Sequence, residues 1–230
     1  MSKALAILGH GKMGRLIEQL APEFGFEVRA RFTTVDVDSL SADTLRGAHI
    51  AVEFTTPHAA PHNLLRLASL GVNTVCGTTG WLEHLPEVRS AVASAGTALV
   101  WSANFSVGVN VFLQTVGRAA TFFAKYPEYD AWGWEIHHSA KKDAPSGTLA
   151  KLADEIRKSG YTRALTLTAN RAGAHPGTHE IGFDSAADTI TLRHTARSRE
   201  GFARGALRAA KWIAGKKGVY EFREILDQLS

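Results

Sequence analysis

Cysteine is almost absent from this sequence, which contains one residue of this type, Cys76, in 230. A single thiol rules out an internal disulfide, and its scarcity agrees with a reducing cytoplasm as the expected location. Internal repeats and low-complexity segments are also missing. With 45% hydrophobic, 21% charged and 9% aromatic residues, the chain has the composition of a globular protein that buries a core, as one large domain or two small ones.

Long apolar stretches and runs of like charge are scarce as well. No stretch is long enough to span a membrane, and the glycine loop that starts at Gly9 leaves no room for the apolar core of a signal peptide. Lysine and arginine outnumber aspartate and glutamate by 26 to 22, a formal charge of +4, without basic–aromatic interleaving. We therefore expect no membrane and no nucleic-acid partner, and small anionic ligands as the reason for the basic balance.

A glycine-rich loop follows the first apolar run. Lys3–Leu8 predicts a strand, and Leu16, Ile17 and Leu20 then fall at helical spacing. The G-x-G-x-x-G motif between them allows a tight turn, close approach of a pyrophosphate and close helix–strand packing. A plain glycine-rich turn is the alternative, but the strand–turn–helix setting favours dinucleotide binding, by Gly9, His10, Gly11, Lys12, Met13 and Gly14.

The end of the second predicted strand, Phe26–Phe32, bears on the choice of cofactor. The dinucleotide motif expects an acid about 20 residues past the glycines, where it holds a ribose hydroxyl. Here Thr33-Thr34 follows the strand, and Asp36 and Asp38 come later. Because a 2′-phosphate meets no carboxylate at Thr33, both NADPH and NADH fit, and the balance inclines slightly to NADPH.

Strands and helices alternate through the first half of the chain. Apolar runs predict strands at Ile50–Phe54, Val72–Cys76 and Ala98–Trp101, with helices over 59–70 and 84–95 between them. This alternation predicts a Rossmann-type parallel sheet with ligands at the carboxyl ends of its strands. Polar residues stand at three of these ends, where each group fits a cofactor site or an ordinary turn: Thr55-Thr56, Gly77-Thr78-Thr79 and Asn104.

The pattern changes near residue 106. A long apolar helix is predicted over Val107–Phe123, then a strand over 129–137 and a helix over 147–159. Strand-like runs follow at 164–168, 178–183 and 189–194, then a helix over 201–214 and a closing segment that we expect to return to the first domain. The chain is therefore α/β, with a second α+β domain that holds a mostly antiparallel sheet. We predict a dinucleotide-binding domain at 1–106 and 206–230, and a substrate-binding and oligomerisation domain at 107–205.

Proton carriers and anion donors are concentrated in the segment Trp134–Thr148, WEIHHSAKKDAPSGT. Two histidines and two lysines stand between a strand and a helix, in what we expect to be a polar loop. The free amides of Gly147 and Thr148 at the helix N-terminus are suited to receive a carboxylate or phosphate. Strand alternation predicts that Glu135 shares a face with His137 and orients it, although a solvated or helix-paired carboxylate fits equally well.

With these motifs the chain resembles the bacterial 4-hydroxy-tetrahydrodipicolinate (dihydrodipicolinate) reductase family. That family carries E-x-H-H-x-x-K-x-D-A-P-S-G-T, which matches Glu135 to Thr148 here. The likeness extends to the glycine loop and to segments that cover nearly the whole chain: Gly77-Thr78-Thr79-Gly80, Ala103 to Asn110, Arg171-Ala172-Gly173 and the region from Ser198 to Gly205. Ser102 replaces a common alanine, and the acid missing at Thr33 is the larger departure.

The resemblance implies reduction of a cyclic dicarboxylate by NADPH or NADH in lysine and diaminopimelate biosynthesis. Proton-donor roles fall to His137 and Lys141, and substrate binding to His138, Gly147 and Thr148. The resemblance also implies a homotetramer assembled through the second half, which agrees with a sheet face that helices leave uncovered. It further implies a cofactor on the glycine loop and on Gly77, Thr78, Thr79, Ser102, Ala103, Asn104 and Phe105. The spacing of the dinucleotide motif adds Thr33 to the expected cofactor contacts.

Two other functional classes fit parts of the sequence. A metal hydrolase would use His137, His138 and Asp143 with a further histidine from His175, His179 or His194. Adjacent strand histidines diverge and no H-E-x-x-H spacing is present, so we expect no metal site. A non-catalytic dinucleotide sensor would have no use for the His-His-Lys loop. The stronger alternative is a reductase of another substrate, which would share the cofactor half and differ within 134–148.

Overall fold

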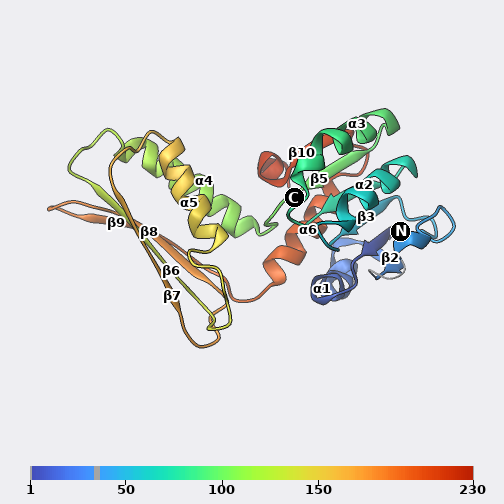
Figure 1. The fold of residues 1–230 in the computed structure, drawn as a ribbon, viewed down its shortest axis with the longest axis horizontal. Coiled ribbons are helices and arrows are strands. Elements are labelled where there is room, and N and C mark those ends of the chain that lie inside the picture. The colour runs from blue at the N-terminus through green and yellow to red at the C-terminus, as the bar shows by residue number, and fades with distance from the viewer. Residues whose placement is uncertain (1, 34–36, 230) are drawn as a thin grey trace. The chain divides into compact units, whose positions relative to one another are not determined.

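The computed structural model describes residues 2–33 and 37–229, which form two compact units. The first unit comprises residues 1–107 and 200–230, and the second comprises residues 108–199. Each contains its own sheet and its own buried core (Figure 1).

A six-stranded parallel sheet organises the first unit, in the order β10-β5-β4-β3-β1-β2. Its order reverses at β1, which lies between β2 and β3, and such a switch point is where open α/β sheets bind ligands. The strands are β1 (Lys3–Leu8), β2 (Phe26–Phe32), β3 (Ile50–Glu53), β4 (Asn73–Cys76), β5 (Ala98–Trp101) and β10 (Gly218–Glu221).

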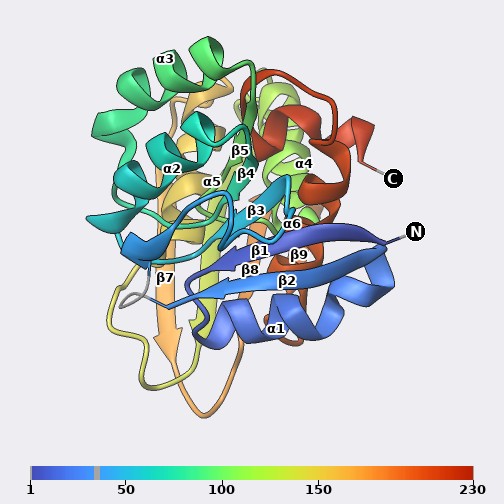
Figure 2. The ribbon, with the colours of Figure 1, turned by 90° about the vertical axis from the view of Figure 1, so that its right-hand side faces the viewer.

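Helices cover both faces of this sheet (Figures 1 and 2). On one face, α1 (Lys12–Leu20) and α6 (Glu200–Trp212) pack against each other, and on the other α2 (Ala59–Ser69) packs against α3 (Leu85–Ala95). All four residues of β3 are buried as a result, which is typical of a strand covered on both faces. Short 3₁₀ helices complete the unit: Ala21–Phe24, Val37–Ser39, Leu82–His84 and Phe222–Gln228.

The closing segment of the chain belongs to the first unit. Strand β10 pairs in parallel with β5, and Phe222 and Ile225 enter the same core as α1 and α6. Gly205 permits close packing there, since a Cβ at this position would lie 1.7 Å from the carbonyl oxygen of Phe105.

The second unit is built on a four-stranded sheet in the order β7-β6-β8-β9. Only β6 and β7 are parallel, so the sheet is mixed and mostly antiparallel, which confirms the predicted fold class. The last two strands are joined by a hairpin turn at 185–188. The strands are β6 (Asp130–His137), β7 (Leu165–Arg171), β8 (Thr178–Asp184) and β9 (Thr189–Thr195).

Two helices lie on one face of this sheet, α4 (Val107–Phe123) and α5 (Gly147–Lys158) (Figure 1). The apolar side of α5 is buried against the sheet through residues spaced as in an amphipathic helix, Leu149, Leu152, Ala153 and Ile156. On β6 the residues of the covered face are buried and the alternate ones, including Trp132 and Trp134, are half-buried. No helix of the described chain has the length and apolar character needed to cross a membrane.

Candidate active site

The glycine loop after β1 is shaped for close backbone packing with an open centre. Gly9 has φ +88°, and a Cβ there would lie 2.2 Å from the carbonyl oxygen of Phe54. A Cβ on Gly14 would lie 2.4 Å from the carbonyl oxygen of Gly9, whereas one on Gly11 would meet no atom within 4 Å. Since Gly11 also caps α1 without a side-chain bond, the first amides of the helix face this space, which fits a pyrophosphate.

The side chain of His10 is held by the neighbouring helix. Its Nε2 lies 2.5 Å from a carboxylate oxygen of Glu18, and Arg31 Nε donates to the other oxygen at 2.6 Å. Hydrogen bonds from Arg31 and then from His10 lower the pKa of Glu18. The amides of Gly9 and His10 both donate to the carbonyl of Phe32, so the loop is fixed to the end of β2.

The end of β2 carries no carboxylate at the predicted ribose position. Thr33 follows the strand and is exposed, and Lys12 opens α1 with an exposed side chain. Asp38 is exposed in a short 3₁₀ helix, whereas Thr34 and Asp36 lie outside the described residues.

A buried carboxylate that the sequence reasoning missed organises the end of β3. Glu53 has no exposed surface, and its oxygens accept bonds from the amide and hydroxyl of Thr55 and from Asn63 Nδ2. The thiol of Cys76 donates to it at 3.2 Å. Burial first, and then the nearby Glu53, raises the pKa of Cys76 well above its usual value. Glu53 thus connects the loop after β3 with α2 and with the end of β4, at the carboxyl edge of the sheet.

The loops after β4 and β5 lie at the same edge as the glycine loop, because their strands are parallel neighbours. A Cβ on Gly77 would lie 2.0 Å from the Phe54 ring. Thr78 Oγ1 is buried and finds no hydrogen-bond partner in the described part of the chain, and such a group suits a ligand. Asn104 is held by Ser102, while the Phe105 ring is buried in the core and packs 4.8 Å from that of Phe222.

In the second unit, Glu135 and His137 share one face of β6, as predicted, and it is the face that the helices cover. Glu135 has no exposed surface, which excludes the alternative of a solvated carboxylate. Its Oε1 accepts the Ser146 amide and Arg171 Nη2, both at 2.8 Å, and its Oε2 accepts the Ser146 hydroxyl. His137 is the last residue of β6 and is 7% exposed. This confirms the strand predicted over 129–137, whereas the expectation that both histidines lie in a polar loop was wrong for His137, because β6 includes it and its side chain is buried.

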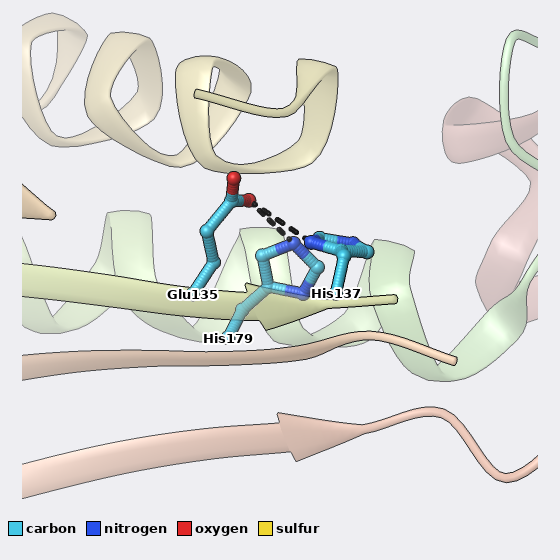
Figure 3. Close-up of side chains that lie close together, drawn as sticks. All are labelled: Glu135, His137 and His179. Atoms are coloured by element: carbon cyan, nitrogen blue, oxygen red, sulfur yellow. Dashed lines mark ion pairs between the residues drawn. The ribbon is translucent and has the colours of Figure 1, made fainter. Parts of the chain in front are cut away.

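Two imidazoles converge on one oxygen of Glu135 (Figure 3). His179 Nε2 lies 3.3 Å and His137 Nδ1 3.6 Å from Oε2, and the two rings are 5.0 Å apart. His179 belongs to β8 and Arg171 to β7. The run predicted at 164–168 ends before Arg171, whereas β7 extends to it. The sequence reasoning noted both residues without placing them together. The alternation of side chains along β7 and β8 is the signal that could have predicted that both residues lie on the same face of the sheet as Glu135.

Burial is the largest single influence on the pKa values of Glu135, His137 and His179. It is the first cause of a lowered pKa for His137, against which Glu135 acts in the opposite direction and Lys141 and Arg171 in the same direction. Burial, then His137, lowers the pKa of His179 to about 4. For Glu135, burial raises the pKa, but the bonds from Ser146 and Arg171 outweigh it and leave a lowered value.

The loop 138–146 carries Lys141, the lysine predicted to donate a proton. Lys141 Nζ lies 2.7 and 2.9 Å from the carboxylate oxygens of Asp143, and this hydrogen bond is the first cause of a lowered pKa for Asp143. Lys142 is exposed, and His138 is half-buried just beyond β6. Arg171 Nη2 also donates to the backbone carbonyl of Asp143, so the loop is tied to the Glu135 cluster.

The N-terminus of α5 is capped from within the cluster. Ser146 Oγ accepts the amide of Leu149 at 3.2 Å while it donates to Glu135. Gly147 is exposed, and a Cβ there would meet no atom within 4 Å. The half-buried Thr148 follows. The backbone amide of Gly147 hydrogen-bonds the Asp143 carboxylate and contributes to its lowered pKa, and Asp143 also pairs with Lys141. This helix start therefore already faces an anionic group, as helix N-termini favour.

Glu135, His137 and His179 are also the described residues whose ligand atoms gather within 4.8 Å, as a metal site requires. The set differs from the one considered for a hydrolase, since His138 and Asp143 are not members. Arg171 and Ser146 already donate to both oxygens of Glu135, and a guanidinium beside the carboxylate opposes a second cation.

A Rossmann-type sheet with this glycine loop, joined in sequence to a mixed-sheet unit rich in proton carriers, defines an NAD(P)H-dependent oxidoreductase of two units. The chain belongs to the dihydrodipicolinate reductase family. Family models described as dihydrodipicolinate reductase, N-terminus and C-terminus, match residues 3–105 and 108–226. The predicted family, enzyme class and cofactor class are thereby confirmed.

Two relatives agree with this assignment, and a solved structure agrees with the fold. The chain is 31% identical over 240 residues to the 4-hydroxy-tetrahydrodipicolinate reductase of Christiangramia forsetii, covering 98% of each chain. It is 35% identical over 253 residues to that of Archaeoglobus fulgidus, covering 94% of this chain and 96% of the other. Its fold matches a dipicolinate-bound dihydrodipicolinate reductase from Paenisporosarcina sp. TG-14 with a TM-score of 0.84 at 22% identity, over 98% and 100% of the two chains.

Proposed function

We propose that this protein reduces 4-hydroxy-tetrahydrodipicolinate to tetrahydrodipicolinate with NADPH or NADH, a step of lysine and diaminopimelate biosynthesis. One observation carries the proposal: the segment 134–148 places a buried imidazole, an ammonium group and an open helix N-terminus around one small region of the second unit. Several relatives of similar length carry the name of this activity.

The first unit, predicted from the sequence at 1–106 and 206–230 and spanning 1–107 and 200–230 in the structure, is proposed to hold the dinucleotide. The open centre of the glycine loop and the unpartnered Thr78 hydroxyl support this assignment. The bound nicotinamide supplies a hydride to the substrate. On the protein side, the contact set is proposed to be Gly9, His10, Gly11, Lys12, Met13, Gly14, Thr33, Gly77, Thr78, Thr79, Ser102, Ala103, Asn104 and Phe105. For Phe105 this contact falls to the backbone, because its ring is in the core.

The second unit, predicted from the sequence at 107–205 and spanning 108–199 in the structure, is proposed to orient the substrate and deliver a proton. A cyclic dicarboxylate needs donors for its carboxylates, which His138 and the amides of Gly147 and Thr148 supply. His137 and Lys141 are the proposed proton donors, since imidazole and amine groups transfer protons near neutral pH when their surroundings tune them.

A coupled assay tests the reaction. Freshly generated 4-hydroxy-tetrahydrodipicolinate is added to the enzyme with NADPH or NADH, and oxidation of the cofactor is followed by absorbance. We expect turnover with both cofactors, and none when the substrate-generating enzyme is omitted. Binding of NADPH without turnover would favour a reductase of a different substrate.

The protein is further proposed to be a cytoplasmic homotetramer assembled through the second unit. The half-buried Trp132 and Trp134 lie on the sheet face opposite α4 and α5, and an apolar sheet face is commonly buried against a partner. Light scattering at micromolar concentration should give four times the mass of the 24.8 kDa chain. A monomer at that concentration would contradict this assembly.

A further inference from the structure

Glu135 is a fully buried carboxylate that connects three separate segments of the second unit. It lies on β6, accepts two bonds from Ser146 at the start of α5, and accepts one from Arg171 at the end of β7. Through Arg171, which also donates to the carbonyl of Asp143, it reaches the loop that carries Lys141. A single carboxylate therefore fixes both the helix N-terminus and the loop between strand and helix.

The charge of Glu135 is compensated by Arg171 within the chain. An unpaired buried carboxylate would be strongly unfavourable, and an arginine partner stabilises its ionised form. Arg171 Nη2 lies 2.8 Å from Glu135, and its own side chain is 17% exposed. The pair is formally neutral and stays so at any pH at which Glu135 is ionised.

His137 faces this pair directly. Its Nδ1 is buried, forms no hydrogen bond within the described chain and lies 3.6 Å from Glu135 Oε2. Protonation of Nδ1 would direct an N–H at the carboxylate, whereas Arg171 and Lys141 oppose the positive charge. The other groups around it are Asp143, on the Lys141 loop, and His179, which is itself faced by His194.

We propose that Glu135 and Arg171 form a positioning pair that fixes the Lys141 loop and sets the balance between neutral and protonated His137. Neither residue contacts the reacting atoms in this proposal. It rests on the proposed function only in taking His137 as a proton donor. The negative charge of Glu135 favours protonated His137 and the positive charge of Arg171 disfavours it. A merely structural role of the two residues would not produce these opposite effects.

NMR titration of histidine side chains in the whole protein, without substrate, tests the pair. The His137 signal is identified by its absence from His137→Gln. Glu135→Gln should lower the pKa of His137 by about one pH unit or more, because the favourable charge within about 4–6 Å is lost. Arg171→Met should raise it. The control Asp154→Asn removes an exposed carboxylate of α5, paired with Arg157, and should leave it unchanged.

The direction of these shifts decides the proposal. Equal titration in wild type, Glu135→Gln and Arg171→Met would overturn it, and so would shifts of the same sign in both variants. If Glu135→Gln does not fold, the rise expected in Arg171→Met decides alone, and its absence overturns the proposal. Glu135→Asp, which keeps the charge, should restore His137 toward its wild-type titration.

Kinetics then separate this inference from the proposed function. Glu135→Gln should lower kcat at neutral pH more than it changes KM, and should move the pH profile of kcat in the direction of the His137 titration. Opposite NMR shifts together with an unmoved kcat profile would support the pair as an electrostatic device and remove His137 from the reaction.

Discussion

Replacing Lys141 by alanine should separate catalysis from folding in this protein. The ammonium group forms an ion pair with Asp143, and the two side chains are 23% and 58% exposed. Ion pairs exposed to this extent contribute roughly 0–1 kcal/mol to stability, because water screens them and both side chains lose freedom. We therefore expect Lys141→Ala to unfold within about 1 kcal/mol of wild type.

The effect on the reaction should be much larger. Loss of a positioned proton donor commonly slows a reaction about a hundredfold to ten-thousandfold. This range corresponds to about 3–5 kcal/mol of transition-state stabilisation, at about 1.4 kcal/mol for each factor of ten. The expected catalytic loss thus exceeds the expected change in stability severalfold.

The assay combines thermal unfolding, NADPH binding and the coupled reaction on one preparation. Lys142→Ala is the matched control, since it removes the neighbouring exposed lysine from the same loop, and it should retain wild-type kcat. Near-wild-type kcat in Lys141→Ala would refute its role as a proton donor. Equal loss in both variants would assign the effect to the charge of the loop.

Three further variants test other parts of the molecule. Ser146→Ala removes the α5 cap and a donor to buried Glu135, so the unfolding free energy should fall by about 1–3 kcal/mol, and an unchanged urea midpoint would contradict that contact. In His179→Gln the unfolding free energy should fall less than in wild type when the pH is lowered. The folded pKa of His179 is about 4, below its ordinary 6.5, so wild type loses about 2 kcal/mol from this group between pH 7 and pH 5, which urea midpoints at both pH values would measure. Thr33→Asp should shift the ratio of kcat/KM from NADPH toward NADH by repelling the 2′-phosphate; an unchanged ratio would place selectivity elsewhere, such as at Lys12.

Local patterns in the sequence were sufficient for the architecture of the first unit. The strand Lys3–Leu8, the glycine loop and the following helix occur where periodicity predicts them, because turn chemistry and apolar spacing act over a few residues. The parallel sheet followed from the alternation of strands and helices. The resemblance carried by residues 135–148 added the family, which composition and periodicity alone do not supply.

The sequence left the environment of these residues undecided. His137 was expected in a polar loop, yet β6 extends to it and buries its side chain. The stability-neutral behaviour expected of Lys141 therefore does not extend to His137→Ala, because a buried side chain is removed there. Glu135 fitted a solvated, a helix-paired or an orienting role; its lack of exposure excludes the first, and its bonds from Ser146 at the start of α5 show the second.

Only the tertiary structure brings the Glu135 cluster together. Arg171 is 36 residues and Ser146 11 residues from Glu135, and His179 comes from the antiparallel partner of β6, where it pairs with Glu135 in register. The same sheet register decides which charges share a buried face, and burial makes their mutual interactions strong. Sequence spacing identified the proton carriers, whereas the pairing of distant strands determined which carboxylate and which guanidinium control them.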